Sequence, residues 1–189
     1  MAVVLTALCE VYFAVCRDWE RQLGKGGAIN ATSQTIAKIS ENIVQSDDAA
    51  IVDRFTTGDA LALNLPADKA HGIYVPMPVS DKLRYRSGKW IVFYLSDSTG
   101  SYSKNGDILW LGNVNAYGNV IPDANWSKHS NGEGKISPIS SIRFSIYTTG
   151  LRELISIEAK STFKINNASN QSDVFKQSAS VCVRNDGPQ

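Results

Sequence analysis

Cysteine is scarce in this chain of 189 residues, with only three copies. Three cysteines do not make the disulfide framework that stabilises many small secreted domains. Cys9 and Cys16 lie in an apolar N-terminal stretch, and Cys182 occupies an alternating apolar position near the C-terminus. A cysteine in the latter setting is usually a small buried hydrophobe. We therefore expect free thiols, with a Cys16–Cys182 bridge as the less favoured alternative.

Histidine is scarcer still, and catalytic motifs are missing. His71 and His129 are the only two histidines, and both fall in loops rich in glycine, proline and asparagine, where a histidine is typically solvated. The chain contains no G-x-S-x-G, H-E-x-x-H, P-loop or G-x-G-x-x-G motif. We therefore predict that the protein is not an enzyme and needs no cofactor. A secreted hydrolase with a non-standard site remains as the last alternative.

Neither sign of charge is in excess. The sequence has 19 Lys and Arg residues against 18 Asp and Glu residues, and the basic residues form no stripe. Because phosphate binding needs a clustered positive surface, nucleic acid is not an expected partner. A hydrophobic content of 43% with 20% charged residues is ordinary for a folded protein. We expect one globular domain with an appendage.

A long hydrophobic run is also missing, although the N-terminus comes close to one. Residues 1–16 are apolar except for Thr6 and Glu10, and residues 17–21 bring the charges and the indole that suit a bilayer surface. Crossing the hydrocarbon takes about 20 apolar residues, so the pattern is typical of the second half of a membrane helix whose first half precedes it. No Lys or Arg precedes the run, unlike in a secretory signal peptide. The side chains expected to contact partners are Val3, Val4, Leu8, Val11, Phe13 and Trp19.

A helical stem is predicted next. Gly24, Gly26 and Gly27 would each cost about 1 kcal/mol inside a helix, so they predict a hinge, a melted stretch or a break between residues 1–23 and residues 24–48. Beyond the glycines, residues recur at intervals of three and four, which is the spacing of one helix face. They are Ile29, Thr32, Ile36, Ile39 and Ile43. This pattern predicts an amphipathic helix that packs one face on the rest of the protein.

From about residue 50 the hydrophobic period changes to two, which is typical of strands. We expect strands around residues 61–65, 89–95, 108–111, 142–147, 151–160 and 174–183, and loops at 66–82, 96–106 and 112–138. Asn105-Gly106 is a strong hairpin signal between two of these strands. The predicted fold class is α+β: a long N-terminal α-helix followed by a globular head, residues 49–189, built as an antiparallel meander of about six strands.

Oxygen donors gather in one loop of the predicted head. Asp97, Asn105 and Asp107 surround the hairpin turn and are weak calcium candidates. Calcium takes six to eight oxygen ligands in a compact set, and the spacing matches no calcium loop. Turn chemistry is therefore the favoured explanation, and no metal is predicted.

Aromatic residues are the remaining binding candidates. Tyr117 and Trp126 lie in loops, where their rings would be available to stack against a sugar. Trp90 and Trp110 lie in apolar strands and are expected to fill the core.

The order of these elements and several short segments resemble the type IV pilin and type II secretion pseudopilin family, in particular its larger minor members of the J-like or W-like class. The segments are residues 35–40 where the helix reaches the head, 58–63 as a first short strand, 85–88, 91–97 and 107–110 as a central hairpin, and 154–160 and 181–185 as the last two strands. The resemblance implies a pilin-like fold and a structural role in a type IV pilus or a type II secretion pseudopilus.

The chain departs from this family at its N-terminus. The family's processing site, a glycine followed by Phe-Thr-Leu-x-Glu, is missing, and residues 5–10 keep only a Thr and a Glu with one residue too many between them. The resemblance implies assembly with other pilin-like subunits through the N-terminal helix, an inner-membrane anchor before assembly, and a periplasmic or cell-surface head. The alternative is a membrane-tethered β-domain that binds carbohydrate through Tyr117 and Trp126.

Overall fold

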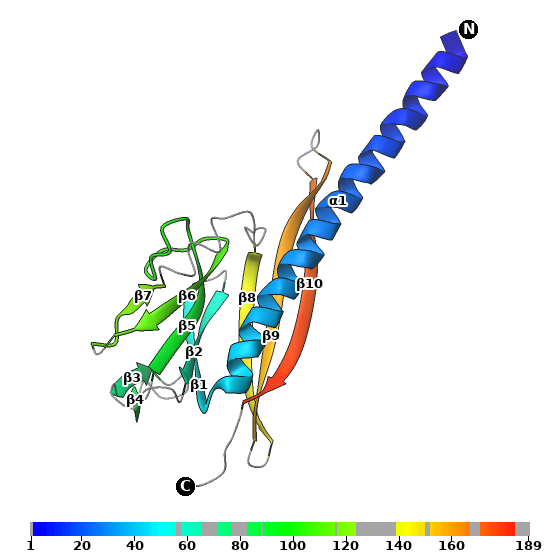
Figure 1. The fold of residues 1–189 in the computed structure, drawn as a ribbon. Helices are drawn as coiled ribbons and strands as arrows, with labels where there is room; N and C mark the ends of the chain where they lie inside the picture. Colours follow the sequence, from blue (N-terminus) through cyan, green and yellow to red (C-terminus); the bar gives the residue numbers. More distant parts are fainter. Residues whose placement is uncertain are drawn as a thin grey trace.

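The fold is that of a computed structural model, which describes residues 2–55, 58–65, 72–76, 83–87, 89–115, 117–123, 139–149, 152–166 and 171–183. It has an α+β layout, in which one long helix, α1 (Ala2–Gln45), comes first and β-strands follow (Figure 1). The 44 residues of α1 correspond to about 66 Å at 1.5 Å per residue. The N-terminal part of α1 extends well beyond the sheet, whereas the C-terminal part lies along it (Figure 1).

Ten strands follow α1 in the described part of the chain. They are β1 (Asp48–Phe55), β2 (Gly58–Leu65), β3 (Gly72–Pro76), β4 (Leu83–Ser87), β5 (Lys89–Ser96), β6 (Ile108–Val114), β7 (Val120–Pro122), β8 (Ile139–Thr149), β9 (Arg152–Asn166) and β10 (Gln171–Cys182).

Eight of these strands form one sheet, and its topology is not the predicted meander. The strand order is β10-β9-β8-β2-β5-β6-β7, with β1 also paired to β2, while β3 and β4 form a separate two-stranded sheet. The last three strands therefore return to β2 instead of extending the sheet beyond β7. β8 meets β2 in parallel through the single pair Gly58 and Ile142. Glycine permits this contact, because a Cβ atom at Gly58 would lie 2.7 Å from the Ile142 carbonyl oxygen.

α1 is continuous where the sequence predicts a break. Gly24, Gly26 and Gly27 all lie within the helix. The helix passes close to β9 at this point, since a Cβ atom at Gly24 would lie 3.4 Å from both the Phe163 side chain and the Lys164 carbonyl oxygen. Helices in proteins owe most of their stability to such tertiary packing and not to intrinsic propensity. The prediction of a hinge or break is therefore wrong, and residues on both sides of the glycines belong to one helix.

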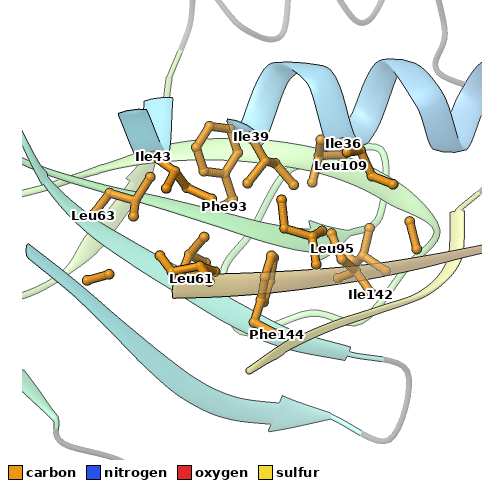
Figure 2. Close-up of a cluster of buried hydrophobic side chains, with 14 of the residues drawn as sticks. Ile36, Ile39, Ile43, Leu61, Leu63, Phe93, Leu95, Leu109, Ile142 and Phe144 are labelled. Atoms are coloured by element: carbon orange, nitrogen blue, oxygen red, sulfur yellow. The ribbon is translucent and has the colours of Figure 1, made fainter. Parts of the chain in front are cut away.

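The larger apolar core lies between α1 and one face of the sheet. Figure 2 shows Ile36, Ile39 and Ile43 of α1 in this core. The labelled strand side chains that share it are Leu61, Leu63, Phe93, Leu95, Leu109, Ile142 and Phe144. The amphipathic face predicted from spacing is thus confirmed, except that Ile29 is exposed.

β5 is apolar on both faces because each face meets a core. Phe93 belongs to the core beneath α1, whereas Trp90 and Tyr94 pack with Trp110 in a second cluster on the other face. The indole of Trp110 donates a hydrogen bond to the Asp97 carbonyl oxygen over 2.8 Å, so its polar edge is satisfied. The prediction that both tryptophans fill the core is confirmed.

Two of the predicted loops contain strands. β3 occupies part of residues 66–82 and pairs with β4. β7 lies within residues 112–138 and pairs with β6, which itself extends to Val114. β3 has five residues and β7 has three, so neither is long enough for an alternating pattern to stand out. Residues 124–138 lie outside the described residues, as do residues 66–71 and 77–82.

Candidate functional site

A group of large apolar side chains is exposed on the N-terminal half of α1. The group consists of Leu8, Val11, Tyr12, Phe13, Val15, Trp19 and Leu23, each with between 61% and 66% of its surface accessible. Single exposed apolar residues are normal, but a contiguous patch of this kind marks an interaction site. Leu8, Val11, Phe13 and Trp19 were predicted to contact partners, whereas the side chains of Val3 and Val4 lie outside the described residues.

Most of the group forms one stripe along the helix. Leu8, Tyr12, Val15, Trp19 and Leu23 follow one another at intervals of four, three, four and four residues. This spacing places them on a single helix face, which we call the apolar stripe. Tyr12 and Val15 were not among the predicted contact residues, although the spacing identifies them.

Charged side chains occupy much of the remaining surface of this half. They are Glu10, Arg17, Asp18, Glu20 and Arg21, and all are exposed. Phe13 lies among them, one turn before Arg17, whose Nε donates a hydrogen bond to the Phe13 carbonyl oxygen over 3.3 Å. Phe13 is therefore exposed but separate from the apolar stripe. No helix in the described ranges combines the length and the apolar character needed to cross a membrane.

The C-terminal half of α1 is held against the sheet by a second face, which we call the seat. It consists of Thr32, Ile36, Ile39 and Ile43, of which Ile39 and Ile43 are completely buried. Thr32 Oγ1 and Ser33 Oγ are hydrogen-bond donors that both lie 3.0 Å from Gln177 Oε1 on β10. The seat thus combines apolar burial with a polar contact to the edge strand.

The seat and the apolar stripe lie on different sides of the helix. At 3.6 residues per turn their mean directions are about 130° apart, and the side chains of Tyr12 and Ile39, which are 27 residues apart, lie on opposite sides. Because the head covers the seat, the apolar stripe faces away from the head. A partner can lie along the stripe without meeting the head of the same copy.

The three cysteines are free thiols, as expected. Cys16 lies beside the apolar stripe, and its hydrogen bond to Tyr12 raises the pKa of that phenol. Cys182 is exposed, which contradicts the expected burial. The alternating pattern was right, but the even-numbered side chains of β10 point away from α1 and into solvent.

The calcium candidates are engaged in the turn between β5 and β6. Asp97 Oδ1 accepts hydrogen bonds from the backbone N–H and the hydroxyl of Thr99, and its Oδ2 lies 3.3 Å from Lys104 Nζ. These contacts lower the pKa of Asp97, with the Thr99 hydroxyl contributing most. Asn105 Oδ1 accepts a hydrogen bond from Gly106 N over 3.0 Å.

Asp107, the third candidate, joins this turn to β8. Its carbonyl oxygen accepts a hydrogen bond from Ile139 N over 2.8 Å. Nowhere in the described residues do three or more His, Cys, Asp or Glu side chains gather as they would around a metal ion. These contacts are those of a turn, which is the favoured explanation, and the weaker calcium hypothesis stays untested.

Tyr117 is 89% exposed, at the turn between β6 and β7. Asn115 Oδ1 organises the turn by accepting hydrogen bonds from Tyr117 N and Asn119 N. Gly118 adopts a φ of 80°, which glycine tolerates without a steric penalty. The turn thus presents the phenol ring to solvent. Trp126, the other proposed stacking residue, lies outside the described residues.

An ion pair between the buried Asp59 and the exposed Arg143 joins β2 to β8, and no sequence pattern pointed to it. Asp59 is buried, and its Oδ1 accepts a hydrogen bond from Arg143 Nη1 over 2.7 Å. Its Oδ2 accepts one from Phe144 N over 3.2 Å. A buried carboxylate is tolerated when it is paired and hydrogen-bonded in this way. The pair links β2 to β8 next to the parallel contact between these strands.

Neither histidine is placed in the structure, since His71 and His129 lie outside the described residues. The prediction that the protein is not an enzyme therefore stays a prediction. Comparison of the chain with models of protein families, with characterised proteins and with solved structures gives no match. What the protein does is inferred from the geometry of the stripe, the seat and the head.

Proposed function

We propose that this chain is a structural subunit of a filament, of the type IV pilin or type II secretion pseudopilin kind, and that it acts by assembly and not by catalysis. The observation that carries the proposal is the apolar stripe. It lies on a helix half that projects beyond the sheet and faces away from the head. The long N-terminal helix followed by an antiparallel-rich sheet is consistent with that family's layout.

In this role the two halves of α1 have separate tasks. The seat fixes the helix to its own head, and the stripe packs against the helices of other subunits. Each subunit then adds one helix to a shared apolar centre and one head to the outer surface. Repetition of such a contact between unlike patches builds an open filament. Before assembly, the same stripe would be sheltered at the inner membrane, with the head on the periplasmic side.

The assembly test compares two neighbouring residues on different faces of the full-length protein. Val15 lies on the stripe, whereas Ala14 lies outside it and is also exposed. We expect Val15→Asp to abolish assembly and Ala14→Asp to leave it intact, as measured by sedimentation velocity and by electron microscopy of filaments. Equal assembly by both variants would show that the stripe is not the contact surface.

The family assignment has a test of its own. The in-frame DNA upstream of codon 1 should encode a short basic leader that ends in Gly, followed by Phe-Thr-Leu-x-Glu and about ten apolar residues. A stop codon immediately upstream, with no such leader, would remove the chain from the pilin family. The assembly experiment would still decide whether the stripe joins subunits.

One observation favours a second function, carbohydrate binding by a tethered β-domain. The Tyr117 ring is exposed on a turn that is braced by its own hydrogen bonds, as expected of a stacking platform. Glycan-array binding that is lost in Tyr117→Ala and kept in Tyr117→Trp would support this function. An array on which the wild-type protein binds no sugar would rule it out.

A further inference from the structure

The outer edge of β10 is a long row of backbone groups that is left unpaired within the described residues. β10 is the last strand in the sheet order and has 12 residues. α1 lies over β9 and β10 and not beside them, since Gly24 lies against Phe163 of β9 and Thr32 contacts Gln177 of β10 (Figure 1). An uncovered edge strand of this length is a template for pairing with another chain.

The outward backbone groups belong to the even-numbered residues of β10. Val183 N donates a hydrogen bond to the Glu153 carbonyl oxygen over 2.9 Å. In the antiparallel register the odd-numbered residues therefore exchange hydrogen bonds with β9. The N–H and C=O groups of even-numbered residues such as Lys176 and Ser178 point outward. Side chains alternate too: Gln177, Ala179 and Val181 lie on the face that carries α1, and the even-numbered residues from 172 to 182 are exposed on the opposite face.

The sequence of this edge is complementary to itself. The three residues before Gln177 are Val174, Phe175 and Lys176, and the three after it are Ser178, Ala179 and Ser180. When two copies run antiparallel with Gln177 opposite Gln177, each large side chain faces a small one, for example Lys176 facing Ser178. The even-numbered residues that face each other are also those with outward backbone groups. Hydrogen bonding and side-chain packing therefore agree on one register.

Charge does not block this pairing. A lysine on an edge strand commonly prevents pairing, but Lys176 Nζ lies 2.7 Å from Glu158 Oε2 on its own sheet. Glu158 Oε1 also lies 3.2 Å from Lys160 Nζ, so this carboxylate offsets part of the charge of both lysines, which lower its pKa. In the self-paired register Lys176 faces the neutral Ser178, so no like charges meet there. Asp173 protects the edge more weakly: its Oδ1 accepts a hydrogen bond from the outward Val174 N–H over 2.8 Å.

We propose that two copies of this chain pair through the outer edges of β10, antiparallel and with Gln177 at the two-fold axis. The contact is isologous, so it covers both edges at once and closes at the dimer. It extends the sheet of one copy into the sheet of the other. None of its residues belongs to the apolar stripe, and the proposal therefore stands or falls independently of filament assembly.

A disulfide experiment reads the register directly. Residue 172 of one copy faces residue 182 of the other, and such a pair has Cα atoms about 5.5 Å apart, within disulfide reach. In a Cys9→Ser/Cys16→Ser background of the full chain, we expect Ser172→Cys to link to Cys182 of the second copy under mild oxidation. Non-reducing gels should show a covalent dimer and no larger species, and mass spectrometry should identify the linked peptides.

Two control cysteines in the same background decide the meaning of that result. Val174→Cys would link to Cys182 only in a register shifted by two residues, and Thr162→Cys lies on β9, one strand inside the edge. Both positions are exposed on the same face as Ser172. Linkage of Ser172→Cys about ten-fold faster than either control supports the proposal. Equal rates, a faster rate at position 174, or no linkage in folded protein would overturn it.

Charge at position 178 gives a second test that needs no thiols. Ser178→Lys would place a lysine opposite Lys176 of the second copy, twice per dimer, whereas Ser178→Glu would place a carboxylate there. Like charges directly opposite each other destabilise strand pairing, so we expect Ser178→Lys to raise the dimer dissociation constant about ten-fold and Ser178→Glu not to raise it. Val15→Asp in both proteins keeps the stripe out of the measurement. Equal dissociation constants would contradict the pairing.

Discussion

Both halves of α1 carry an apolar face, but the two faces have opposite relations to the head. In the C-terminal half, Ile39 and Ile43 are buried against the sheet, and in the N-terminal half, Tyr12 and Trp19 remain exposed on the far side of the helix. An apolar helix face therefore does not define its own role. The seat contributes to the stability of the subunit, and the stripe becomes useful only when a second molecule covers it.

Truncation within the seat should have the largest effect. Ile39→Ala removes a completely buried side chain and leaves a cavity, so we expect a loss of about 2–5 kcal/mol in the free energy of unfolding. Leu8→Ala on the stripe should change that free energy by less than about 0.5 kcal/mol. Urea denaturation of both variants measures the contrast. Similar losses would mean that the two halves are not distinct.

Substitutions at the junction between the halves should raise the free energy of unfolding instead of lowering it. Cβ atoms at Gly26 and Gly27 would have no neighbour within 4 Å, so replacing both glycines by alanine should stabilise the helix by about 1–2 kcal/mol. Gly24→Ala should gain less, because its Cβ would come within 3.4 Å of Phe163. Helical circular dichroism and urea denaturation together measure this gain. A loss of stability in the double variant would indicate that the glycines are needed as a hinge.

The polar part of the seat should contribute less than the apolar part. Gln177→Ala removes the acceptor that Thr32 and Ser33 share on β10, and we expect it to cost about 1 kcal/mol. Gln22→Ala, an exposed position on the projecting half, is the matched control and should be nearly neutral. Urea denaturation separates the two. Equal costs would argue that the Gln177 contact does not hold the helix.

Acid should produce the smallest change, away from the seat. Lys176 lowers the pKa of Glu158 from its ordinary 4.5, so the unfolded chain binds the proton more readily than the folded one. This contribution to stability is present above pH 4.5 and is lost as the pH falls through the lower folded pKa. The pair is partly exposed, so the loss should stay below about 1 kcal/mol. Glu158→Gln should flatten the pH dependence in denaturation below pH 4.5, and an unchanged slope would assign it to other carboxylates such as Asp97.

Patterns within one segment predicted much of the fold. The spacing of Ile36, Ile39 and Ile43 was sufficient to find the seat. Alternation and apolar runs located β2, β5, β6, β8 and β10 to within about three residues and β9 except for its last six, whereas these patterns did not predict β1, β3, β4 or β7. Continuity through Gly24 was not predictable, because the contact with Phe163 comes from a strand far along the chain. The sheet order was missed for the same reason: the Asp59–Arg143 pair joins residues 84 positions apart.

The candidate site was predicted in part. Leu8 and Trp19 were chosen from composition and their place beside the charged segment, and both belong to the stripe. Tyr12 and Val15 were passed over because an apolar run offers many candidates until the helix assigns each one a face. Phe13 was predicted with them, but its side chain lies on another face of the helix. The position of β10 at the edge of the sheet could not be predicted from hydrophobic periodicity, because it depends on the strand order and not on the sequence of the strand itself.

The contact between Thr32 and Gln177 also has a consequence for biosynthesis. It spans 145 residues, so at about 5–20 residues per second the ribosome needs roughly 7–30 s to make the second partner after the first. For most of that interval the isoleucines of the nascent helix have neither β9 nor β10 to cover them. The head is completed only when the C-terminal strands emerge, and a truncated chain is left with two bare apolar faces in place of one.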